Sequence, residues 1–214
     1  MESRHSSLPN IQEQAYEFAH KLAYKQLAGM SVEDLCRKTG VQSADSSEII
    51  VEYLNQSYLV TLPNGEISLR DSKEKVPLKD KILILHYLTL AKGTPTANRL
   101  ITYKQLSGGA SYFPAFSQRT IEPLLRHFGK EPELLIDAAV KLGSHKANYG
   151  DIAVTINAFP RVPVTIALWR GDDEFAPRGS IMFDSSVCDY LSTEDITVLC
   201  ETIAWRLVSL GKHQ

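Results

Sequence analysis

Two runs of alternating side chains near the C-terminus constrain the fold of this chain more than any other feature. Apolar residues occupy every second position of both runs: Ile152, Val154, Ile156 and Ala158, then Val164, Ile166 and Leu168. This period of two is that of β-strands with one buried face. The connection Pro160-Arg161-Val162-Pro163 is too short for a crossover between parallel strands, so we predict an antiparallel pair.

The same unit continues into a third strand and a helix. A ten-residue loop, Arg170 to Gly179, leads to a third strand predicted at Ser180 to Asp184. Ser192 to Asp195 is typical of a helix N-terminus with an acidic first turn. Apolar residues then recur at helical intervals: Ile196, Leu199, Ile203, Leu207 and Leu210. We predict a strand, strand, strand, helix unit from Asp151 to Leu210, with the amphipathic helix covering one face of the sheet.

The N-terminal third predicts helices followed by a small antiparallel sheet. Helical spacing of apolar residues predicts a helix over Ile11 to Ala28 and a shorter one over Val32 to Lys38. Ser31 is the expected N-cap of the shorter helix, and Gly40 its end. From Glu48 to Leu69 the period becomes two, and turn residues divide the segment into three strands. We expect a three-stranded meander there.

The middle of the chain predicts a buried helix and several shorter elements. Pro77 to Ala91 is apolar almost all round, and such a helix is normally buried on most sides. Ile101 to Leu106 has the pattern of a short strand, and the Gly- and aromatic-rich stretch Ser107 to Phe116 that follows has turn character. Further helices are predicted at Thr120 to Phe128 and at Pro132 to Leu142, each ended by a glycine.

Together these elements indicate an α+β fold with antiparallel sheet regions and about six helices. A chain of 214 residues is long enough for one substantial core and short for two independent domains. We therefore expect a disordered tail over 1–10 and a single domain over 11–214. Within it, 11–75 holds the first helix and the meander, and 76–214 the main core. Whether the two β regions form one sheet or two stays open.

Composition and charge exclude several classes of protein. Hydrophobic residues make up 43% and charged residues 22% of the chain, which is ordinary globular usage. The net charge of −2, with scattered Lys and Arg, argues against nucleic acid as a partner. The longest apolar run, Ile82 to Leu90, is about half of a membrane-spanning helix, so we expect no membrane. The polar start, Met1 to Ser7, lacks a secretory core, and we expect a cytoplasmic protein.

Three cysteines without a CxxC pair argue against disulfides and against an iron–sulfur cluster built by this chain alone: Cys36, Cys188 and Cys200.

Several short motifs, in a fixed order, resemble a known family. They are Leu83 to Leu88, Gly108-Gly109 with Tyr112 and Phe116, Pro160 to Pro163, Trp169 to Phe175, and Phe183-Asp184. From about Ile11 to Leu210 the chain resembles domain-of-unknown-function family 3786 of anaerobic bacteria and archaea. The resemblance implies a cytoplasmic protein of anaerobic metabolism and suggests a link to corrinoid or other tetrapyrrole metabolism. Some relatives look like fusions to a four-cysteine iron–sulfur module that this chain lacks, so an electron-transfer role would need an iron–sulfur or corrinoid partner protein. The resemblance supplies no catalytic residue.

The stretch from Gly108 to Arg119 is the best candidate for a small-molecule site. Its glycines allow close backbone approach, its aromatics offer flat apolar area, and its arginine can clamp a carboxylate or phosphate. The spacing of nucleotide-binding loops is absent. A turn with core aromatics is the alternative. The candidate cofactor-binding residues from this region are Tyr103, Gly108, Gly109, Tyr112, Phe116 and Arg119.

Three further positions, His86, Arg161 and Trp169, complete the cofactor-binding set. His86 lies in the apolar helix, where a neutral imidazole is able to ligate a metal or the iron or cobalt of a tetrapyrrole. A hydrogen-bonded core histidine is the alternative. Arg161 and Arg170 flank the central strands and, with Trp169, are candidates to line one end of the sheet. Surface exposure with packed stems is the alternative reading of these arginines.

An acidic loop is the candidate metal site. Asp172, Asp173 and Glu174 offer adjacent carboxylates to a hard cation, joined by Asp184 if the hairpin folds back. The spacing is not that of a calcium loop. A solvated hairpin tip is the alternative.

Three hypotheses for function follow. The leading one is a non-enzymatic cofactor- or ligand-binding accessory protein, with an organic ligand such as haem or a corrinoid held between Gly108 to Arg119 and the C-terminal sheet. The second is a metal-dependent enzyme that uses the acidic loop. The third is a protein-interaction module for an iron–sulfur partner. Hydrolases with GxSxG or HExxH motifs are disfavoured because neither motif is present.

Overall fold

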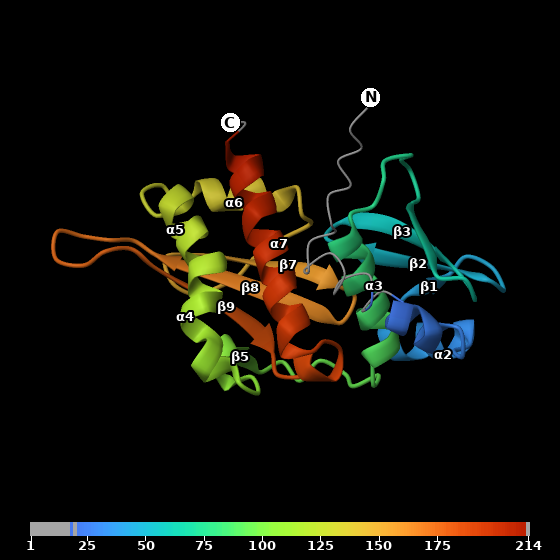
Figure 1. Ribbon diagram of the computed structural model, residues 1–214. Helices are drawn as coiled ribbons and strands as arrows, with labels where there is room; N and C mark the ends of the chain where they lie inside the picture. Colours follow the sequence, from blue (N-terminus) through green and yellow to red (C-terminus); the bar gives the residue numbers. More distant parts are fainter. Residues whose placement is uncertain (1–17, 19–20, 213–214) are drawn as a thin grey trace, which may run out of the picture.

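A computed structural model describes residue 18 and residues 21–212, and the fold is described for these residues. They form two antiparallel sheets, the helices α2 to α7 and part of an N-terminal helix, arranged as an α+β fold (Figure 1). The predicted fold class is confirmed, and the open question of the sheets is answered: the β regions form two sheets rather than one.

The smaller sheet is the predicted meander with one extra strand. Its order is β1-β2-β3-β4, with bounds Gln42–Ser43, Glu48–Tyr53, Gln56–Thr61 and Glu66–Leu69. Helix α2 (Val32–Thr39) precedes it and has the predicted ends. The Oγ atom of Ser31 accepts a hydrogen bond from the amide of Asp34, and Gly40 ends the helix at φ 75°, where a side chain would be strained.

The larger sheet contains the predicted C-terminal strands. Its order is β5-β9-β8-β7-β6, with bounds Leu100–Thr102, Arg178–Asp184, Val162–Trp169, Ile152–Phe159 and His145–Lys146. Only Pro160 and Arg161 lie between β7 and β8, so that turn is shorter than predicted. The loop between β8 and β9 runs from Arg170 to Pro177, because β9 begins before Ser180. Both edge strands are short, which limits pairing with other chains.

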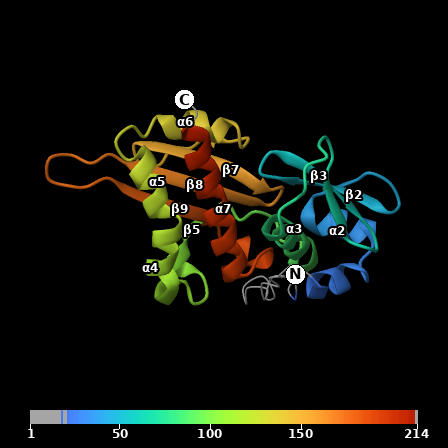
Figure 2. The ribbon, with the colours of Figure 1, turned by 45° about the horizontal axis from the view of Figure 1, so that its top comes forward.

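Four helices of the described part of the chain cover one face of the larger sheet: α4 Gly109–Arg119, α5 Ile121–Phe128, α6 Leu134–Val140 and α7 Thr193–Gly211. A further helix, α3, spans Leu78–Leu90. Helix α7 lies across the sheet, as predicted, with α4 and α5 beside it (Figure 2). Helix α3 lies between α7 and the smaller sheet and is buried along most of its length, which confirms the buried apolar helix.

The stretch predicted to have turn character is helical, and the strand before it is shorter than predicted. Strand β5 ends at Thr102, and Tyr103 to Gln105 form a 3₁₀ turn. Gly108, at φ 70°, then begins α4, which continues through Pro114. Two glycines and a proline weaken a helix locally. Tertiary packing overrides that preference, because Phe116 is fully buried with its ring stacked on Tyr103.

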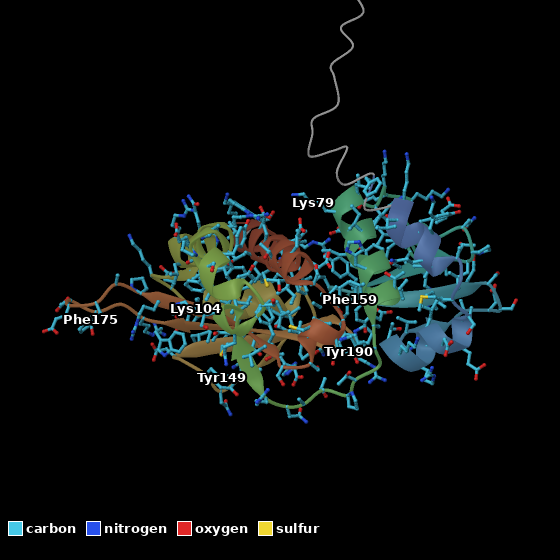
Figure 3. The ribbon with its side chains drawn as sticks, turned by 60° about the horizontal axis from the view of Figure 1, so that its bottom comes forward. Lys79, Lys104, Tyr149, Phe159, Phe175 and Tyr190 are labelled. Atoms are coloured by element: carbon cyan, nitrogen blue, oxygen red, sulfur yellow. The ribbon has the colours of Figure 1, made fainter. Side chains whose placement is uncertain are left out.

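An aromatic stack joins the two sheets. The ring of Phe159, in β7, stacks on Tyr87 of α3 at a centroid distance of 4.2 Å and on Tyr53 of β2 at 4.8 Å. The amide of Leu54 donates to the carbonyl of Ala158 across the same junction. Figure 3 shows Phe159 in the middle of the molecule. The hydrophobic core therefore runs without interruption from one sheet to the other.

The predicted N-terminal helix is only partly covered by the described residues. Residues 21–27 are helical, with Ala23 and Leu27 buried, whereas Phe18 and Leu22 are exposed. The rest of the predicted helix and the predicted tail over 1–10 lie outside the described residues. Within the described ranges, no helix is long and apolar enough to cross a membrane.

Candidate functional site

A groove between α4 and α7 is the candidate site. The two helices run side by side from neighbouring N-termini (Figure 1), where the hydroxyl of Thr193 donates to the carbonyl of Ser107 at 3.0 Å. Two turns further along, the guanidinium of Arg119 forms an ion pair with Glu201. The volume of the groove is about 380 Å³. The residues that line it are Tyr103, Ser107, Gly108, Tyr112, Arg119, Thr193, Glu194, Thr197 and Val198.

Tyr103 presents a hydroxyl group at the buried side of the groove. Its ring is 1% exposed and stacks on Phe116 at a centroid distance of 3.8 Å. Its hydroxyl oxygen lies 2.8 Å from the Oγ1 atom of Thr197. Burial raises the pKa of Tyr103, although the hydrogen bond to Thr197 acts in the opposite direction. The phenol therefore stays neutral and keeps its proton for hydrogen bonding.

Arg119 is the cation of the groove and is held in place from two sides. Its Nη1 atom donates to the hydroxyl of Tyr112 at 3.1 Å, and its Nη2 atom donates to the carboxylate of Glu201. Partial burial acts to lower the pKa of Arg119, but the hydrogen bond and the charge of Glu201 outweigh it and raise that pKa. A guanidinium has five N–H donors, and these two bonds use two of them. The others have no acceptor among the described residues and can bind an anionic group.

The N-terminus of α4 lies at the other end of the groove, where Gly108 is among the lining residues. Among the described residues, no side chain caps this helix, whose N-cap is Gly108, and the amide of Gly109 donates to the carbonyl of Leu106. The N-terminus of α7 differs, since Ser192 and Asp195 cap it reciprocally. The groove thus combines a fixed cation, hydroxyl groups and aromatic surface, a set suited to binding a small organic anion.

The structure brings four predicted cofactor-binding residues together along this groove: Tyr103, Gly108, Tyr112 and Arg119. Gly109 and Phe116 do not line the groove, but both pack against Tyr103, which does. A Cβ atom on Gly109 would lie 1.9 Å from the carbonyl oxygen of Tyr103, so a larger residue does not fit there. We expected the C-terminal sheet to form the other side of the site, and this expectation was wrong. The groove is closed by α7 and not by the sheet, because α4 packs against α7.

His86 lies away from the groove and has a structural partner. Its Nδ1 atom is 2.6 Å from the Oδ1 atom of Asp195, in the first turn of α7. The Oδ2 atom of the same carboxylate accepts from the hydroxyl of Ser192 at 2.6 Å. This is the hydrogen-bonded histidine that we gave as the alternative to a metal or tetrapyrrole ligand.

The prediction that Arg161, Arg170 and Trp169 line one end of the sheet together is wrong. Arg161 lies in the turn that begins β8, whereas Trp169 and Arg170 lie at the opposite end of this strand. An antiparallel hairpin separates the two positions by the length of the strand, about 23 Å. Arg161 donates to the carbonyl of Arg37 in the last turn of α2, and Arg170 pairs with Glu133.

The structure separates Asp184 from the other three predicted metal ligands. Asp172 accepts hydrogen bonds from the amides of Glu174 and Phe175, which lower its pKa and order the tip of the loop. Asp173 and Glu174 are exposed in the same loop. Asp184 lies at the other end of β9, about 20 Å away, and accepts hydrogen bonds from Ser186 and the amide of Ala97. Among the described residues, no three His, Cys, Asp or Glu side chains are placed to hold a metal ion.

A second cleft lies beneath the acidic loop, with a volume of about 500 Å³. Eight of its ten lining residues, Arg170 to Pro177, belong to the loop itself, and the others are Gly129 and Lys130. Its shape therefore depends on one projecting segment. The groove between α4 and α7 is built by two packed helices and is the better-supported site.

Sequence reasoning missed the contribution of α7 to the groove. Glu194, Val198 and Glu201 recur at intervals of four and three, and Thr193 and Thr197 are four residues apart. These intervals place each set on one helix face. A polar stripe beside the apolar stripe of the predicted helix was the available signal. It could not show which element would face it.

Comparison with known proteins gives one match. The family described as "Domain of unknown function (DUF3786)" matches residues 31–206, well over half of the chain. No curated protein and no solved structure matches it. The match covers α2 to most of α7, and so includes both sheets and every residue that lines the groove. The chain therefore belongs to the DUF3786 family, as its sequence motifs predicted.

Proposed function

We propose that this protein is a non-enzymatic ligand-binding accessory protein whose groove between α4 and α7 takes a small organic molecule with a carboxylate or phosphate group. The observation that carries the proposal is the position of Arg119. Its guanidinium lines the groove, is fixed by Glu201 and Tyr112, and keeps unused N–H donors. A planar guanidinium is well suited to paired hydrogen bonds with a carboxylate or phosphate.

The size and lining of the groove support a small ligand. A volume of about 380 Å³ lies at the lower end of the range for small-molecule sites, which is roughly 300 to 1,000 Å³. The rings of Tyr103 and Tyr112 and the side chain of Val198 offer apolar contact beside the polar groups. Ligands of the size of benzoate or phenyl phosphate match this combination.

Binding is favoured over catalysis by the chemistry of the lining. Among the described residues that line the groove, none is His, Cys or Lys. The side chains present are one guanidinium, one carboxylate and several hydroxyls. Such groups orient a ligand by hydrogen bonds. Nucleophilic catalysis needs a nucleophile paired with a base, and no hydroxyl of the described lining residues bonds to the carboxylate of Glu194.

A tetrapyrrole remains an alternative ligand within this proposal. Iron or cobalt of a tetrapyrrole is commonly held by His, Cys, Met or Tyr. Tyr103 and Tyr112 are the available groups in the groove, and His86 is engaged with Asp195 elsewhere. Absorbance titration of the full chain with haem and with cobalamin tests this version. A saturable spectral shift that is lost in Tyr112→Phe would support it, and unchanged spectra would reject it.

Nuclear magnetic resonance titration of the full chain with benzoate and with phenyl phosphate tests the main proposal. We expect saturable shifts of backbone amides in α4 and α7. In Arg119→Gln, the affinity for both probes should fall about tenfold or more, since a charge-assisted hydrogen bond contributes roughly 1.5 to 3 kcal/mol. Arg37→Gln is the matched control, because Arg37 is an exposed, ion-paired arginine on α2, and its affinity should equal that of the wild type.

Tyr112→Phe provides a second variant in case loss of Arg119 disturbs folding. Tyr112 is 45% exposed, so removal of its hydroxyl leaves the core intact, yet it removes one of the two bonds that hold Arg119. We expect severalfold weaker binding of both probes. The proposal is overturned if neither probe shifts α4 and α7 at millimolar concentration, or if binding is the same in Arg119→Gln as in the wild type.

The proposal includes a cytoplasmic location. The cysteines support it, because Cys36, Cys188 and Cys200 are all free. Free thiols are usual in a reducing compartment, whereas exported proteins of this size commonly form disulfides.

A further inference from the structure

Glu194 is the uncommitted carboxylate of the groove. It lies in the first turn of α7, is exposed, and forms no hydrogen bond or ion pair with the described residues. The neighbouring acids of α7 are both engaged. Asp195 bonds to His86 and Ser192, and Glu201 pairs with Arg119. Glu194 is therefore free to receive a group from the ligand.

The two charges that face the groove lie towards its opposite ends. Glu194 and Glu201 are seven residues apart on α7, which corresponds to about 10 Å along the helix axis. Arg119 pairs with Glu201 and marks the far end. Between the two ends the lining consists of hydroxyls, tyrosine rings and Val198. A ligand that reaches from one end to the other would meet a cation first and a carboxylate last.

The desolvation free energy of the Glu194 carboxylate determines which chemical group the ligand must place beside it. A ligand that fills the groove removes water from this carboxylate, and desolvation of an unpaired charge is unfavourable. An apolar ligand group beside Glu194 leaves this desolvation uncompensated, and an anionic group adds charge repulsion. An ammonium group compensates it with a charge-assisted hydrogen bond.

We infer that the ligand is an extended zwitterion, with a carboxylate or phosphate at Arg119 and an ammonium group at Glu194. This inference rests on the proposed function and specifies its ligand class. The separation of the charges distinguishes it from an α-amino acid, whose ammonium and carboxylate groups share one carbon atom. An ω-amino carboxylate has the required arrangement, with a methylene chain to lie against the tyrosine rings.

Titration of the full chain with three probes tests the inference. The probes are 6-aminohexanoate, which carries both charges, hexanoate, which carries only the carboxylate, and hexylamine, which carries only the ammonium group. We expect 6-aminohexanoate to bind about tenfold more tightly than hexanoate, and hexylamine to bind more weakly than either. Shifts of the amides of α4 and α7 report the site.

Variants assign the preference to Glu194. Glu194→Gln should bind 6-aminohexanoate no more tightly than hexanoate, while its affinity for hexanoate stays equal to that of the wild type or rises. Glu33→Gln is the matched control, because Glu33 is also an exposed acid in the first turn of a helix, α2, but lies outside the groove. It should keep the full preference.

Each other outcome separates this inference from the proposed function. Equal binding of 6-aminohexanoate and hexanoate, or an unchanged preference in Glu194→Gln, overturns the zwitterion and leaves an anion-binding groove. Binding of benzoate without binding of 6-aminohexanoate has the same meaning. If benzoate, phenyl phosphate and all three probes fail to bind, the proposed function and the zwitterion are both overturned.

Discussion

The Nδ1 atom of His86 lies 2.6 Å from the Oδ1 atom of Asp195 and joins the middle of α3 to the first turn of α7. Asp195 is 6% exposed and has two roles at once. One carboxylate oxygen is hydrogen-bonded to Nδ1 of His86. The other accepts hydrogen bonds from the amide and the hydroxyl of Ser192, the N-cap of α7. The pair thus fixes the start of the helix that covers the larger sheet.

Replacement of Asp195 should destabilise the fold through both roles. Asp195→Ala removes the reciprocal cap and leaves the partly buried His86 ring without its partner. We expect a loss of about 1 to 3 kcal/mol in the free energy of unfolding, measured by urea denaturation. Glu33→Ala is the control, since Glu33 occupies the first turn of α2 without capping it. Similar losses in the two variants would contradict the assigned role of Asp195.

A partly buried ion pair links α3, α7 and the smaller sheet. The Oδ2 atom of Asp80 lies 2.7 Å from Nη2 of Arg206, and its Oδ1 atom accepts from the hydroxyl of Tyr53 at 3.1 Å. Asp80→Ala leaves a partly buried guanidinium without its carboxylate partner, so we expect a loss of about 1 to 3 kcal/mol in unfolding free energy. Asp80→Ala combined with Arg206→Met should recover part of that loss. A double variant less stable than Asp80→Ala would contradict this account.

Two phenylalanines should differ sharply in their contribution to stability. Phe159 is 1% exposed and stacks on Tyr53 and Tyr87, whereas Phe175 is 65% exposed at the tip of the projecting hairpin (Figure 3). Phe159→Ala leaves a cavity at the junction of the sheets and should cost about 3 to 5 kcal/mol. Phe175→Ala should change the unfolding free energy by about 0.5 kcal/mol or less. Thermal and urea denaturation of both variants measure this difference.

Asp184 should make stability depend on pH in the acid range. Burial acts to raise its pKa, but hydrogen bonds from Ser186 and from the amide of Ala97 outweigh it and hold the pKa below the usual 3.8. A carboxyl group with a lowered pKa contributes its full stabilisation above the unfolded pKa and loses it as the pH falls through the folded one. We therefore expect this contribution to be complete above about pH 5 and to disappear below the usual pKa.

Asp184→Asn isolates that effect. The variant should be less stable than the wild type at pH 6 and should lose less stability between pH 6 and pH 3, because the titrating group is gone. Urea unfolding at the two pH values provides the measurement. An equal loss in both proteins would show that other groups set the acid sensitivity.

Sequence alone predicted the elements whose signals are contained in short segments. The alternation of residues 152–169, the Ser31 cap of α2 and the apolar stripe of α7 each depend on neighbours within a few positions. Such patterns report burial and hydrogen bonding directly. The family match rests on motifs of the same local kind.

Tertiary structure decided what local patterns could not. The glycines and proline between residues 108 and 116 indicate a turn, yet the segment is helical because Phe116 packs on Tyr103 in the core. The pairing of Arg119 with Glu201, 82 positions apart, and of His86 with Asp195, 109 positions apart, arises only when α7 crosses the sheet. The path of α7 across the sheet decides whether an arginine, a histidine or a carboxylate faces the groove or a structural partner. The two residues of each contact lie in different segments, so no local pattern contains both.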